Sequence, residues 1–598
     1  MERSYQEAWR CWLVLLALVA LLGAPVVVRS AETPANPSGA IGRQIDEFAL
    51  RDYRGKTHRL ADFAAARFMV VAFIGTECPL VNLYAPRLVE LHQRFADQGV
   101  VFIGVNANRQ DSLTEVAAHA RRHGIAFPVL KDPTHKVADL FAAERTPQVF
   151  VLDENRQVRY VGRIDDQYGV GYQRPEVNRE DLAVALNELL ADSVVSVSQT
   201  ESPGCIIGRT RAIEGEGDVT YANQISRLFQ NRCIACHRAG QIAPFPLDSY
   251  EEAVGWAETI REVVRDERMP PWHASPEHGQ FNNDARLTDA EKQLIEDWVA
   301  AGAPEGDPAQ LPPPLEFSAD WQIDEPDQVI YMSDEPFRVA AEGVLDYQYF
   351  VVDPGFQKDR WVAAAEPRPG CRAVVHHIIV FVKPPGEPVE GHGGLSGFFA
   401  AAAPGSPPLV FQPGMAKKIP AGSKLIFQMH YTPNGTEQLD RSSLGLIFAD
   451  PDTITQEVRT ASAANPFLVI PPQANNFRVD AYRVFRRPAT LLALYPHMHL
   501  RGKSFRYVAE YPDGSSEILL DVPAYDFNWQ NAYVLSEPKP MPEGTTLHCI
   551  AHFDNSSDNL WNPDPNRIVT FGEQTFDEMM IGFFDAARPV QATGESGD

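Results

Sequence analysis

Positive charge is scarce in this sequence. Its 598 residues include 53 lysines and arginines against 79 aspartates and glutamates, which gives a net charge of -26. Because such a chain is repelled by nucleic-acid phosphates and by anionic lipid surfaces, we expect no nucleic acid among its partners. The apolar fraction of 44% is that of a globular protein, and the length predicts several domains rather than one.

A long hydrophobic run lies at the N-terminus, from Trp12 to Val28, behind Arg3 and Arg10. Small polar residues follow it, which is typical of a signal peptide over residues 1–31. The run is close to the minimum length of a membrane-spanning helix, so an uncleaved membrane anchor is the alternative. Both interpretations predict an exported chain, in the periplasm or another extracytoplasmic compartment where disulfides can form.

Strand-like and helical patterns alternate over residues 41–190, which predicts an α/β sheet. The strand-like runs read FMVVAFIG, VVFIGVNAN and QVFVLD. Cys78 follows the first run and opens a helix, where the helix dipole lowers the pKa of a thiol. Thr146-Pro147 directly precedes another strand, as a cis-proline beside a thiol site would.

These residues resemble the redoxin branch of the thioredoxin-like superfamily. Cys78 matches the first cysteine of the Cys-x-x-Cys helix motif and Pro86 matches the helix proline, but Val81 stands in place of the second cysteine. The peroxiredoxin pattern is also altered, because Thr76 precedes Cys78 by two residues rather than three. The resemblance implies either a one-thiol mechanism, with Cys205 resolving Cys78, or a reactive but non-catalytic thiol in a docking domain.

An acidic, serine-rich stretch over residues 191–218 predicts a linker, and a Cys-x-x-Cys-His motif follows it. Cys233, Cys236 and His237 form the pattern of covalent haem c attachment, with His237 as the proximal iron ligand. A zinc site or a disulfide is the alternative. No second cysteine pair lies nearby, so His273 or His278 would have to complete a zinc site.

The residues after this motif predict the rest of a small all-α haem domain over residues 219–303. Met269 lies in a proline-flanked loop and is the predicted sixth iron ligand, with His273 as its competitor. Thr288 and Glu291 form a capping box at the start of a further helix. The pattern resembles class I cytochromes c, which implies a one-electron carrier whose reduction potential a Met/His iron raises. The predicted buried face of that helix consists of Leu294, Ile295, Trp298 and Val299.

Helical patterning fades after a proline-rich linker at residues 304–317, and short β-rich runs predict β-sandwiches. Histidines concentrate in three of these runs, and a methionine follows. Imidazole and thioether ligands together suit copper, particularly Cu(I). His376 and His377 are adjacent, so they share one ion only if a bulge or a strong twist turns both toward it. The full set is His376, His377, His430, His497, His499 and Met579.

This region resembles the copper type II, ascorbate-dependent monooxygenases, which include peptidylglycine α-hydroxylating monooxygenase and dopamine β-monooxygenase. The resemblance implies two tandem jelly-roll-like domains, here residues 318–470 and 471–586, each with one copper ion. The electron-transfer copper would be held by His376, His377 and His430. The oxygen-activating copper would be held by His497, His499 and Met579, with Met580 as an alternative to Met579.

The substrate-binding residues differ from those of the peptide-amidating relative. Where that enzyme holds a carboxylate with Arg, Asn and Tyr, this chain has Tyr495, Ile581 and Phe583. The resemblance therefore implies an apolar pocket and a substrate other than a C-terminal glycine peptide.

Together these patterns predict an exported copper monooxygenase that uses molecular oxygen to hydroxylate a C–H bond of a small molecule. Electrons would arrive through the fused haem c, from ascorbate, a quinol-linked cytochrome or a thiol protein. Two alternatives stay open: a non-catalytic copper and haem electron-transfer or copper-handling protein, and a thiol peroxidase acting through Cys78. Cys371 and Cys549 are a candidate disulfide across the sandwich, and residues 587–598 are expected to be disordered.

Overall fold

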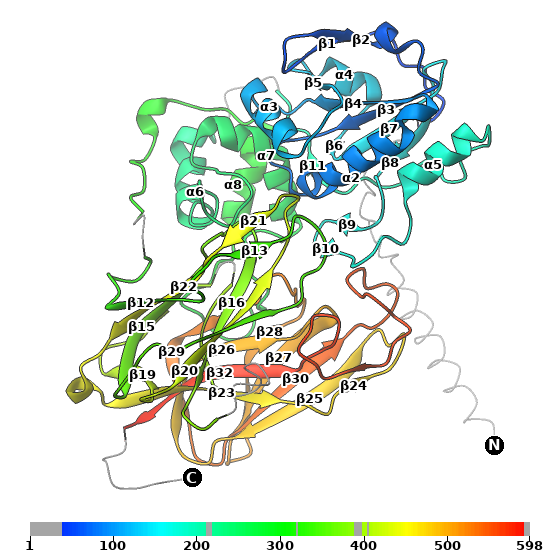
Figure 1. The fold of residues 1–598 in the computed structure, drawn as a ribbon. Helices are drawn as coiled ribbons and strands as arrows, with labels where there is room; N and C mark the ends of the chain where they lie inside the picture. The colour runs from blue at the N-terminus through cyan, green and yellow to red at the C-terminus, as the bar shows by residue number, and fades with distance from the viewer. Residues whose placement is uncertain (1–38, 211–217, 318–320, 388–396, 404–405, 591–598) are drawn as a thin grey trace, which may run out of the picture.

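The computed structural model describes residues 39–210, 218–317, 321–387, 397–403 and 406–590. Figure 1 shows an α/β domain, a helical domain beside it and a large β region that follows them in the chain. The predicted signal peptide, residues 1–31, lies outside the described residues. Within the described ranges, no helix has both the length and the hydropathy that a membrane span requires.

The α/β domain is built on a seven-stranded sheet in the order β2-β1-β5-β4-β3-β7-β8. The three strand-like runs of the sequence form β3 (Phe68–Phe73), β4 (Val100–Asn106) and β7 (Gln148–Leu152), so the α/β prediction is confirmed. Every residue of β3 is buried, because helices and loops cover both faces of the sheet. The other elements are β1 (Ala49–Asp52), β2 (Thr57–Arg59), η1 (Leu60–Phe63), α2 (Pro79–Phe95), η2 (Ala96–Gln98), α3 (Leu113–Arg122), β5 (Val129–Lys131), α4 (Lys136–Phe141), β6 (Arg145–Thr146), β8 (Val158–Gly162), β9 (Tyr168–Gly169), β10 (Tyr172–Gln173) and α5 (Asp181–Leu190).

The α/β domain extends beyond its predicted end, so the linker predicted at residues 191–218 is wrong over much of its length. Val195 packs in the core of this domain, and Ile207 is fully buried in it. Strand β11 (Cys205–Ile206) pairs with β6. The serine and acidic content that predicted a linker did not reveal these buried apolar residues. Residues 211–217 lie outside the described residues.

The helical domain consists of the π-helical turn η3 (Tyr221–Ile225), α6 (Ser226–Arg232), α7 (Tyr250–Arg265), α8 (Asp289–Ala300) and η4 (Pro308–Gln310). Its core surrounds two fully buried indoles, Trp256 and Trp298. The predicted capping box of α8 is confirmed: Glu291 N–H donates to Thr288 Oγ1 at 3.2 Å, and Thr288 N–H donates to Glu291 Oε2 at 2.7 Å. Helix α7 was not predicted.

The segment between α7 and α8 leaves the helical domain and packs on strand β29 (Tyr533–Met541). Asn282 N–H donates to Val534 O at 2.9 Å, and Ser536 N–H donates to Gln280 O at 2.9 Å. The Trp272 ring lies against Tyr533, with ring centroids 4.9 Å apart. The helical domain is therefore joined to the β region by a docked segment as well as by the proline-rich stretch at residues 304–317.

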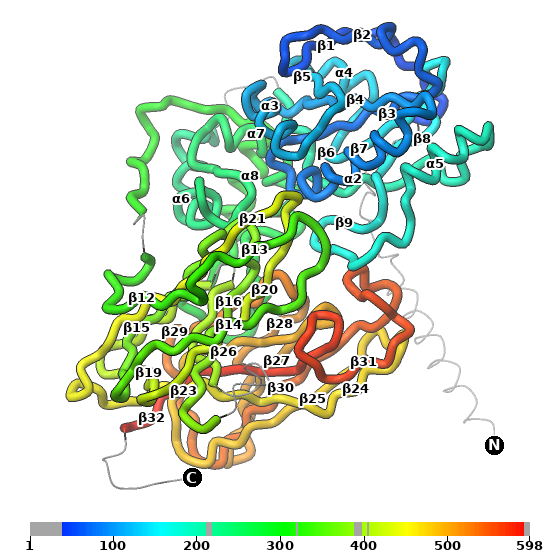
Figure 2. The backbone as a smooth tube through the Cα atoms, viewed as in Figure 1, coloured from blue at the N-terminus to red at the C-terminus, as the bar shows by residue number. Residues whose placement is uncertain are grey.

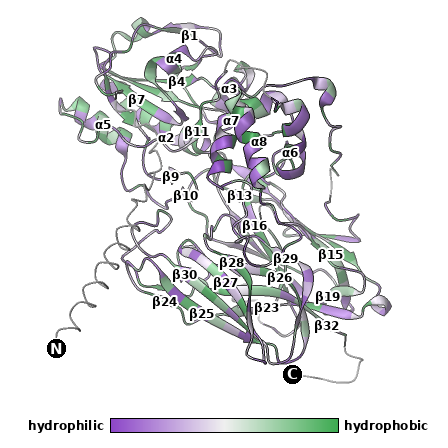
Figure 3. Cartoon of the chain, turned by 180° about the vertical axis from the view of Figure 1, so that it is seen from behind, coloured by the Kyte–Doolittle hydropathy of each residue, from purple (hydrophilic) through white to green (hydrophobic). Residues whose placement is uncertain are grey.

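The β region has two halves that share one long sheet, in the order β12-β22-β15-β19-β23-β32-β26-β29 with β18 beside β15. Figure 2 follows the chain through both halves. A four-stranded sheet belongs to each half, β14-β20-β16-β17 and β25-β30-β27-β28. Seen from behind, the β region carries both hydrophobic and hydrophilic residues (Figure 3), and burial alternates along β30. A largely β C-terminal region is thus confirmed.

The strands of the first half are β12 (Gln328–Tyr331), β13 (Phe337–Val339), β14 (Gln348–Val352), β15 (Arg360–Arg368), β16 (Val375–Lys383), β17 (Phe398–Ala402), β18 (Leu409–Val410), β19 (Met415–Ile419), β20 (Lys424–Tyr431), β21 (Gln438–Asp440) and β22 (Ser443–Phe448), followed by the turn η5 (Pro451–Thr453). The second half contains β23 (Gln456–Ala464), β24 (Val469–Ile470), β25 (Phe477–Val484), β26 (Ala489–His497), β27 (Gly502–Glu510), β28 (Ser516–Val522), β30 (Thr546–Phe553), β31 (Val569–Thr570) and β32 (Ile581–Pro589) in addition to β29.

Two predicted boundaries of the β region are wrong. Strand β23 pairs along its whole length with β32, so the second half begins near residue 456 rather than 471. Strand β32 continues to Pro589, past the predicted end at residue 586, because the same pairing holds it. The rest of the predicted tail, residues 591–598, lies outside the described residues.

The candidate disulfide between Cys371 and Cys549 is also wrong. Both cysteines are free. Cys371 packs against the core of the first half, whereas Cys549 is fully buried in the core of the second half, on β30. Because each sulfur lies in a different hydrophobic core, the two cannot form a bridge without unfolding one of them.

Candidate functional site

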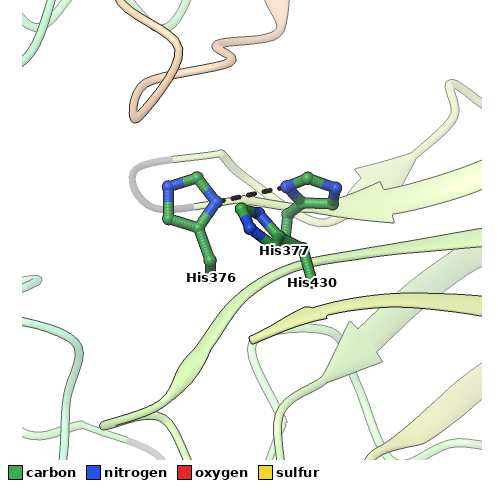
Figure 4. Close-up of side chains that lie close together, drawn as sticks. All are labelled: His376, His377 and His430. Carbon is green, nitrogen blue, oxygen red and sulfur yellow. Dashed lines mark hydrogen bonds between the residues drawn. The ribbon is translucent and has the colours of Figure 1, made fainter. Parts of the chain in front are cut away.

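Three histidines converge between neighbouring strands of the first half. His376 and His377 lie on β16, and His430 lies on β20. The pairing of these strands shifts between Val375, opposite Tyr431, and His377, opposite His430, so His376 has no partner. This β-bulge turns both adjacent imidazoles toward His430 (Figure 4), as the shared-ion prediction required.

The nitrogens of this cluster are arranged as metal ligands are. His376 Nδ1 and His377 Nδ1 are 3.2 Å apart, and one nitrogen from each of the three rings lies within 4.8 Å of the others. Two imidazoles that bind one ion tetrahedrally at about 2.0–2.1 Å would place their nitrogens about 3.3 Å apart. His430 Nδ1 is buried and has no hydrogen-bond partner. Burial lowers the pKa of His376 to about 4 and that of His377 well below its ordinary value, which keeps both rings in the neutral, metal-binding form.

The second set of predicted ligands lies where β26 ends and β32 begins. His497 is the last residue of β26 and pairs with Ile581, two residues after Met579. The buried carboxylate of Glu578 accepts hydrogen bonds from the N–H groups of His499 at 2.8 Å and Met579 at 3.1 Å. One side chain therefore holds both ligand-bearing segments together.

Hydrogen bonds also orient both imidazoles of this second set. His497 Nδ1 lies 2.6 Å from Gln530 Oε1, and His499 Nδ1 lies 3.3 Å from Asp577 O. Because these oxygens only accept, each Nδ1 carries the proton and each Nε2 keeps a lone pair for a ligand. His499 Nε2 is buried without a partner. The residues fit a copper ion held by two imidazoles and a thioether.

The side chains of the two neighbouring methionines lie in different surroundings. Met579 lines a cavity together with His497, whereas Met580 is fully buried in the core of the second half. Met579 is therefore the better ligand, and the alternative of Met580 is disfavoured.

A small cavity lies beside His497 and Met579, between the two halves of the β region. Ile581 and Phe583 line it, as expected, but Tyr495 does not, because its hydroxyl donates to Asp585 Oδ2 at 2.9 Å. The cavity is mainly apolar, with a few polar groups at its wall. The remaining lining residues are Tyr347, Ile379, Phe381, Gln428 and Glu573.

Two aromatic residues that the sequence did not single out lie between the histidine sets. The ring of Tyr347 is 5.1 Å from that of His430 and 6.3 Å from that of His499. The ring of Phe527 is 5.6 Å from His430 and 6.1 Å from His499. A lone Tyr or Phe in a loop carries no sequence signal for such a role. One aromatic layer therefore contacts both predicted metal centres.

The Cys-x-x-Cys-His motif follows α6. Cys233 and Cys236 are free, half-buried thiols. His237 Nδ1 lies 3.1 Å from Phe245 O, which fixes the proton on Nδ1 and leaves Nε2 as the ligand atom. Free thiols and an oriented imidazole fit covalent haem attachment.

The structure gives no support to a sixth iron ligand. Met269 follows α7, where its N–H donates to Val263 O at 3.1 Å, while the His237 ring contacts Phe245. His273 lies in the docked segment, near the carboxylate of Asp526 in the β region. Met269 therefore stays a prediction. Among the described residues, only His376, His377 and His430 form a group of three or more His, Cys, Asp or Glu side chains close enough to bind one metal ion. This result does not support a zinc site at Cys233.

Cys78 caps the N-terminus of α2, as predicted, and is fully buried. Its Sγ donates to Thr146 O at 3.0 Å, beside the predicted cis peptide bond of Pro147. Pairing of β11 with β6 sets Cys205 opposite Thr146, and the two thiols share a hydrogen bond. Burial opposes ionisation, but hydrogen bonds from Cys205 and from the Val81 backbone bring the pKa of Cys78 down to about 7, while that of Cys205 is raised.

Comparison with known proteins identifies this α/β domain. Residues 41–161 match the model of the AhpC/TSA family. These residues form a thioredoxin-like redoxin domain. The thiol-disulfide oxidoreductase ResA of Geobacillus thermodenitrificans (strain NG80-2) is 28% identical over 148 residues, 25% of this chain and 82% of that protein. The redoxin domain is accordingly of an oxidoreductase type.

Two solved structures are similar to part of the chain. A hypothetical protein from Sinorhizobium meliloti 1021 is 32% identical and covers 29% of this chain and 96% of its own, with a TM-score of 0.27. An uncharacterized conserved protein from Geobacillus kaustophilus is 31% identical and covers 28% of this chain and 90% of its own, with a TM-score of 0.26. These relatives extend over less than a third of the chain, so the activity of the whole is a proposal.

Proposed function

We propose that this chain is a copper-dependent monooxygenase that hydroxylates a C–H bond of a small, mainly apolar substrate. The observation that carries the proposal is the bulge in β16, which directs His376 and His377 together at His430. A bulge that places three imidazoles, two of them buried, around one point and leaves His430 Nδ1 buried without a hydrogen-bond partner is costly unless an ion joins them.

The residues of the chain would divide the work between two copper ions. His376, His377 and His430 would hold the ion that stores an electron, and His497, His499 and Met579 would hold the ion beside the cavity. When bound, the second copper would supply the chemistry of oxygen activation.

Side chains around the second copper position would orient the ligands and the substrate. Gln530 and the Asp577 carbonyl hold the ligand tautomers of the two imidazoles. Ile581 and Phe583 exclude water from the cavity and offer an apolar surface to the substrate. A hydrocarbon portion of the substrate would therefore lie against these two side chains.

The helical domain would deliver electrons through a haem c held by Cys233, Cys236 and His237. Its docked segment supports this role, because Pro271 O accepts from Asn531 Nδ2 at 2.8 Å. Asn531 follows the loop that carries Phe527, which contacts His376. Tethering within one chain makes the transfer effectively intramolecular. Ascorbate, a quinol-linked cytochrome or a thiol protein would reduce the haem.

Metal and haem analysis together with oxygen uptake tests the proposal. Protein that is exported during its expression should carry one covalent haem and two copper ions. It should consume oxygen when apolar C–H substrates are added. Met579→Ala should lose the substrate-dependent oxygen uptake. A protein with both metals but no such uptake for any substrate would favour the alternative of a non-catalytic copper and haem protein.

A second candidate function is thiol-disulfide or thiol peroxidase chemistry at Cys78, favoured by its hydrogen bond with Cys205. It predicts peroxide or disulfide reduction that Cys78→Ser abolishes and that His497→Ala leaves unchanged. The reverse pattern would remove this candidate.

A further inference from the structure

The thiol pair of the redoxin domain is covered by the helical domain. Cys78 has no exposed surface, and Cys205 packs against the cores of both domains. Helix α7 lies over β11 and β6: Ile206 N–H donates to Thr259 Oγ1 at 3.2 Å, and Arg145 forms an ion pair with Glu262 at 2.6 Å. A partner protein therefore cannot reach Cys78 Sγ while α7 is in place.

The backbones of the two domains also meet closely beside the thiols. A Cβ built on Gly208 would lie 2.4 Å from Gly255 O on α7, and one built on Gly255 would lie 2.6 Å from Gln110 Cβ. Glycine at both positions permits this approach. The cover over the thiols is thus a close-packed interface rather than a loose contact.

A line of contacts leads from the thiol pair to the haem-attachment histidine. Glu77, the residue before Cys78, lies beside the indole of Trp256 on α7. The Trp256 and Phe245 rings are stacked, with centroids 4.0 Å apart and an interplanar angle of 11°. Phe245 O accepts from His237 Nδ1 at 3.1 Å. Two aromatic rings therefore connect the thiol site to the histidine of the Cys-x-x-Cys-His motif.

We infer that Cys78 and Cys205 form an internal two-electron donor whose redox partner is the haem attached at His237, with Trp256 and Phe245 as the contact between them. The inference rests on the proposed haem attachment. It assigns the redoxin domain a role inside the chain, in place of a role as a docking site for another protein.

The proposed reaction is the two-electron oxidation of the two thiols to a disulfide. Two S–H bonds break and one S–S bond forms between Cys78 and Cys205, which releases two protons to solvent and two electrons. The electrons leave one at a time through Trp256 and Phe245, and a one-electron acceptor, the copper centres or an added oxidant, takes them from the haem domain. Dithiols of thioredoxin-like proteins can have low reduction potentials, so a haem c of higher potential would take electrons from the thiols. A small dithiol reductant restores the pair.

An anaerobic oxidative titration of the full chain, loaded with haem and stripped of copper, tests the inference. The protein is fully reduced, freed of reductant and titrated with ferricyanide. We expect the haem absorbance to stay that of the reduced form through the first two equivalents and to change with the third. Mass spectrometry at two equivalents should find a disulfide between Cys78 and Cys205.

Variants make the outcome specific. Cys205→Ser and Cys78→Ser should lower the titre to a single equivalent, while the matched control Cys371→Ser should leave it unchanged. Trp256→Leu should keep the full titre but slow the re-reduction of oxidised haem several-fold in a stopped-flow trace. The use of two cysteine variants guards against one that fails to fold.

Two results would overturn the inference: a wild-type titre of one equivalent, or oxidised haem that the reduced thiols fail to re-reduce. Both differ from a failure of the proposed haem attachment, in which the mass spectrum would show no covalent haem, and from a failure of the monooxygenase proposal, in which substrate-dependent oxygen uptake would be absent.

Discussion

Met579 and Met580 are adjacent, yet one faces the cavity with His497 and the other is buried in the core of the second half. Met579→Ala should therefore remove one of the two coppers, with a smaller loss of stability than Met580→Ala, because Met579 borders a cavity whereas Met580 is fully buried. Met580→Ala should keep both coppers and lower the free energy of unfolding by about 2–5 kcal/mol, because it leaves a cavity. Copper analysis and urea unfolding of both variants measure this. Copper loss in Met580→Ala alone would reverse the ligand assignment.

At the scale of single residues, one polar side chain also holds together the segments that carry His499 and Met579. Glu578 is buried, and its carboxylate accepts from the N–H groups of His499, Arg501 and Met579. Glu578→Gln should replace one acceptor oxygen with an amide N–H that faces these donors. We expect this change to lower the free energy of unfolding by roughly 1–3 kcal/mol. We expect lower stability and weaker copper retention at the second site alone. Metal analysis of this variant after dialysis against a chelator would check it, and unchanged retention would contradict it.

At the scale of the element, the bulge of β16 decides the first site. Removal of His376 by deletion would leave Val375 and His377 in regular register with Tyr431 and His430. We expect this deletion variant to fold and to bind one copper instead of two. Deletion of the regularly paired Ile379 is the matched control, because it moves the following residues to the opposite face of the sheet and should unfold the first half. If both deletions unfold, the bulge is required for folding rather than for copper.

At the scale of the whole molecule, the close approach of α7 to the redoxin domain depends on Gly255. Gly255→Ala gains roughly 1 kcal/mol of helix propensity, but the new Cβ would lie 2.6 Å from Gln110 Cβ. Overpacking of that kind costs about 1–3 kcal/mol. We expect the interface to loosen and Cys78 to react faster with iodoacetamide. Glu251→Ala, on the exposed face of α7, is the control, and equal alkylation rates would contradict this role of the interface.

The same interface should make stability depend on pH. Burial, together with the nearby carboxylates of Glu252 and Asp111, raises the pKa of Glu77 to about 8 from 4.5. The folded protein then holds a proton that the unfolded chain releases, so this group lowers the free energy of unfolding as pH rises from about 4.5 to 8. Glu77→Gln should be more stable than wild type at high pH and equal at low pH in urea unfolding. Glu154→Gln, in an exposed turn, is the control; a constant difference across pH would contradict the assignment.

Much of the candidate site could be predicted because its signals are local. The histidine pairs, the Cys-x-x-Cys-His motif and the helix that Cys78 opens each occupy a few consecutive residues. Helix α7 could also have been predicted, because Ser249 is a good N-cap residue at its start, where it accepts from Glu252 N–H, and apolar residues recur at helical spacing. The aromatic layer of Tyr347 and Phe527 was not, since nothing near either residue distinguishes it.

The sequence by itself determined which side chains are available for chemistry and which local elements present them, because periodicity and capping act over one or two turns. Only the tertiary structure decided that Cys205 meets Cys78, that Cys371 and Cys549 lie in separate cores, and that Met579 rather than Met580 faces the cavity. Those outcomes depend on pairing and packing between segments far apart in the chain, which composition and spacing do not encode.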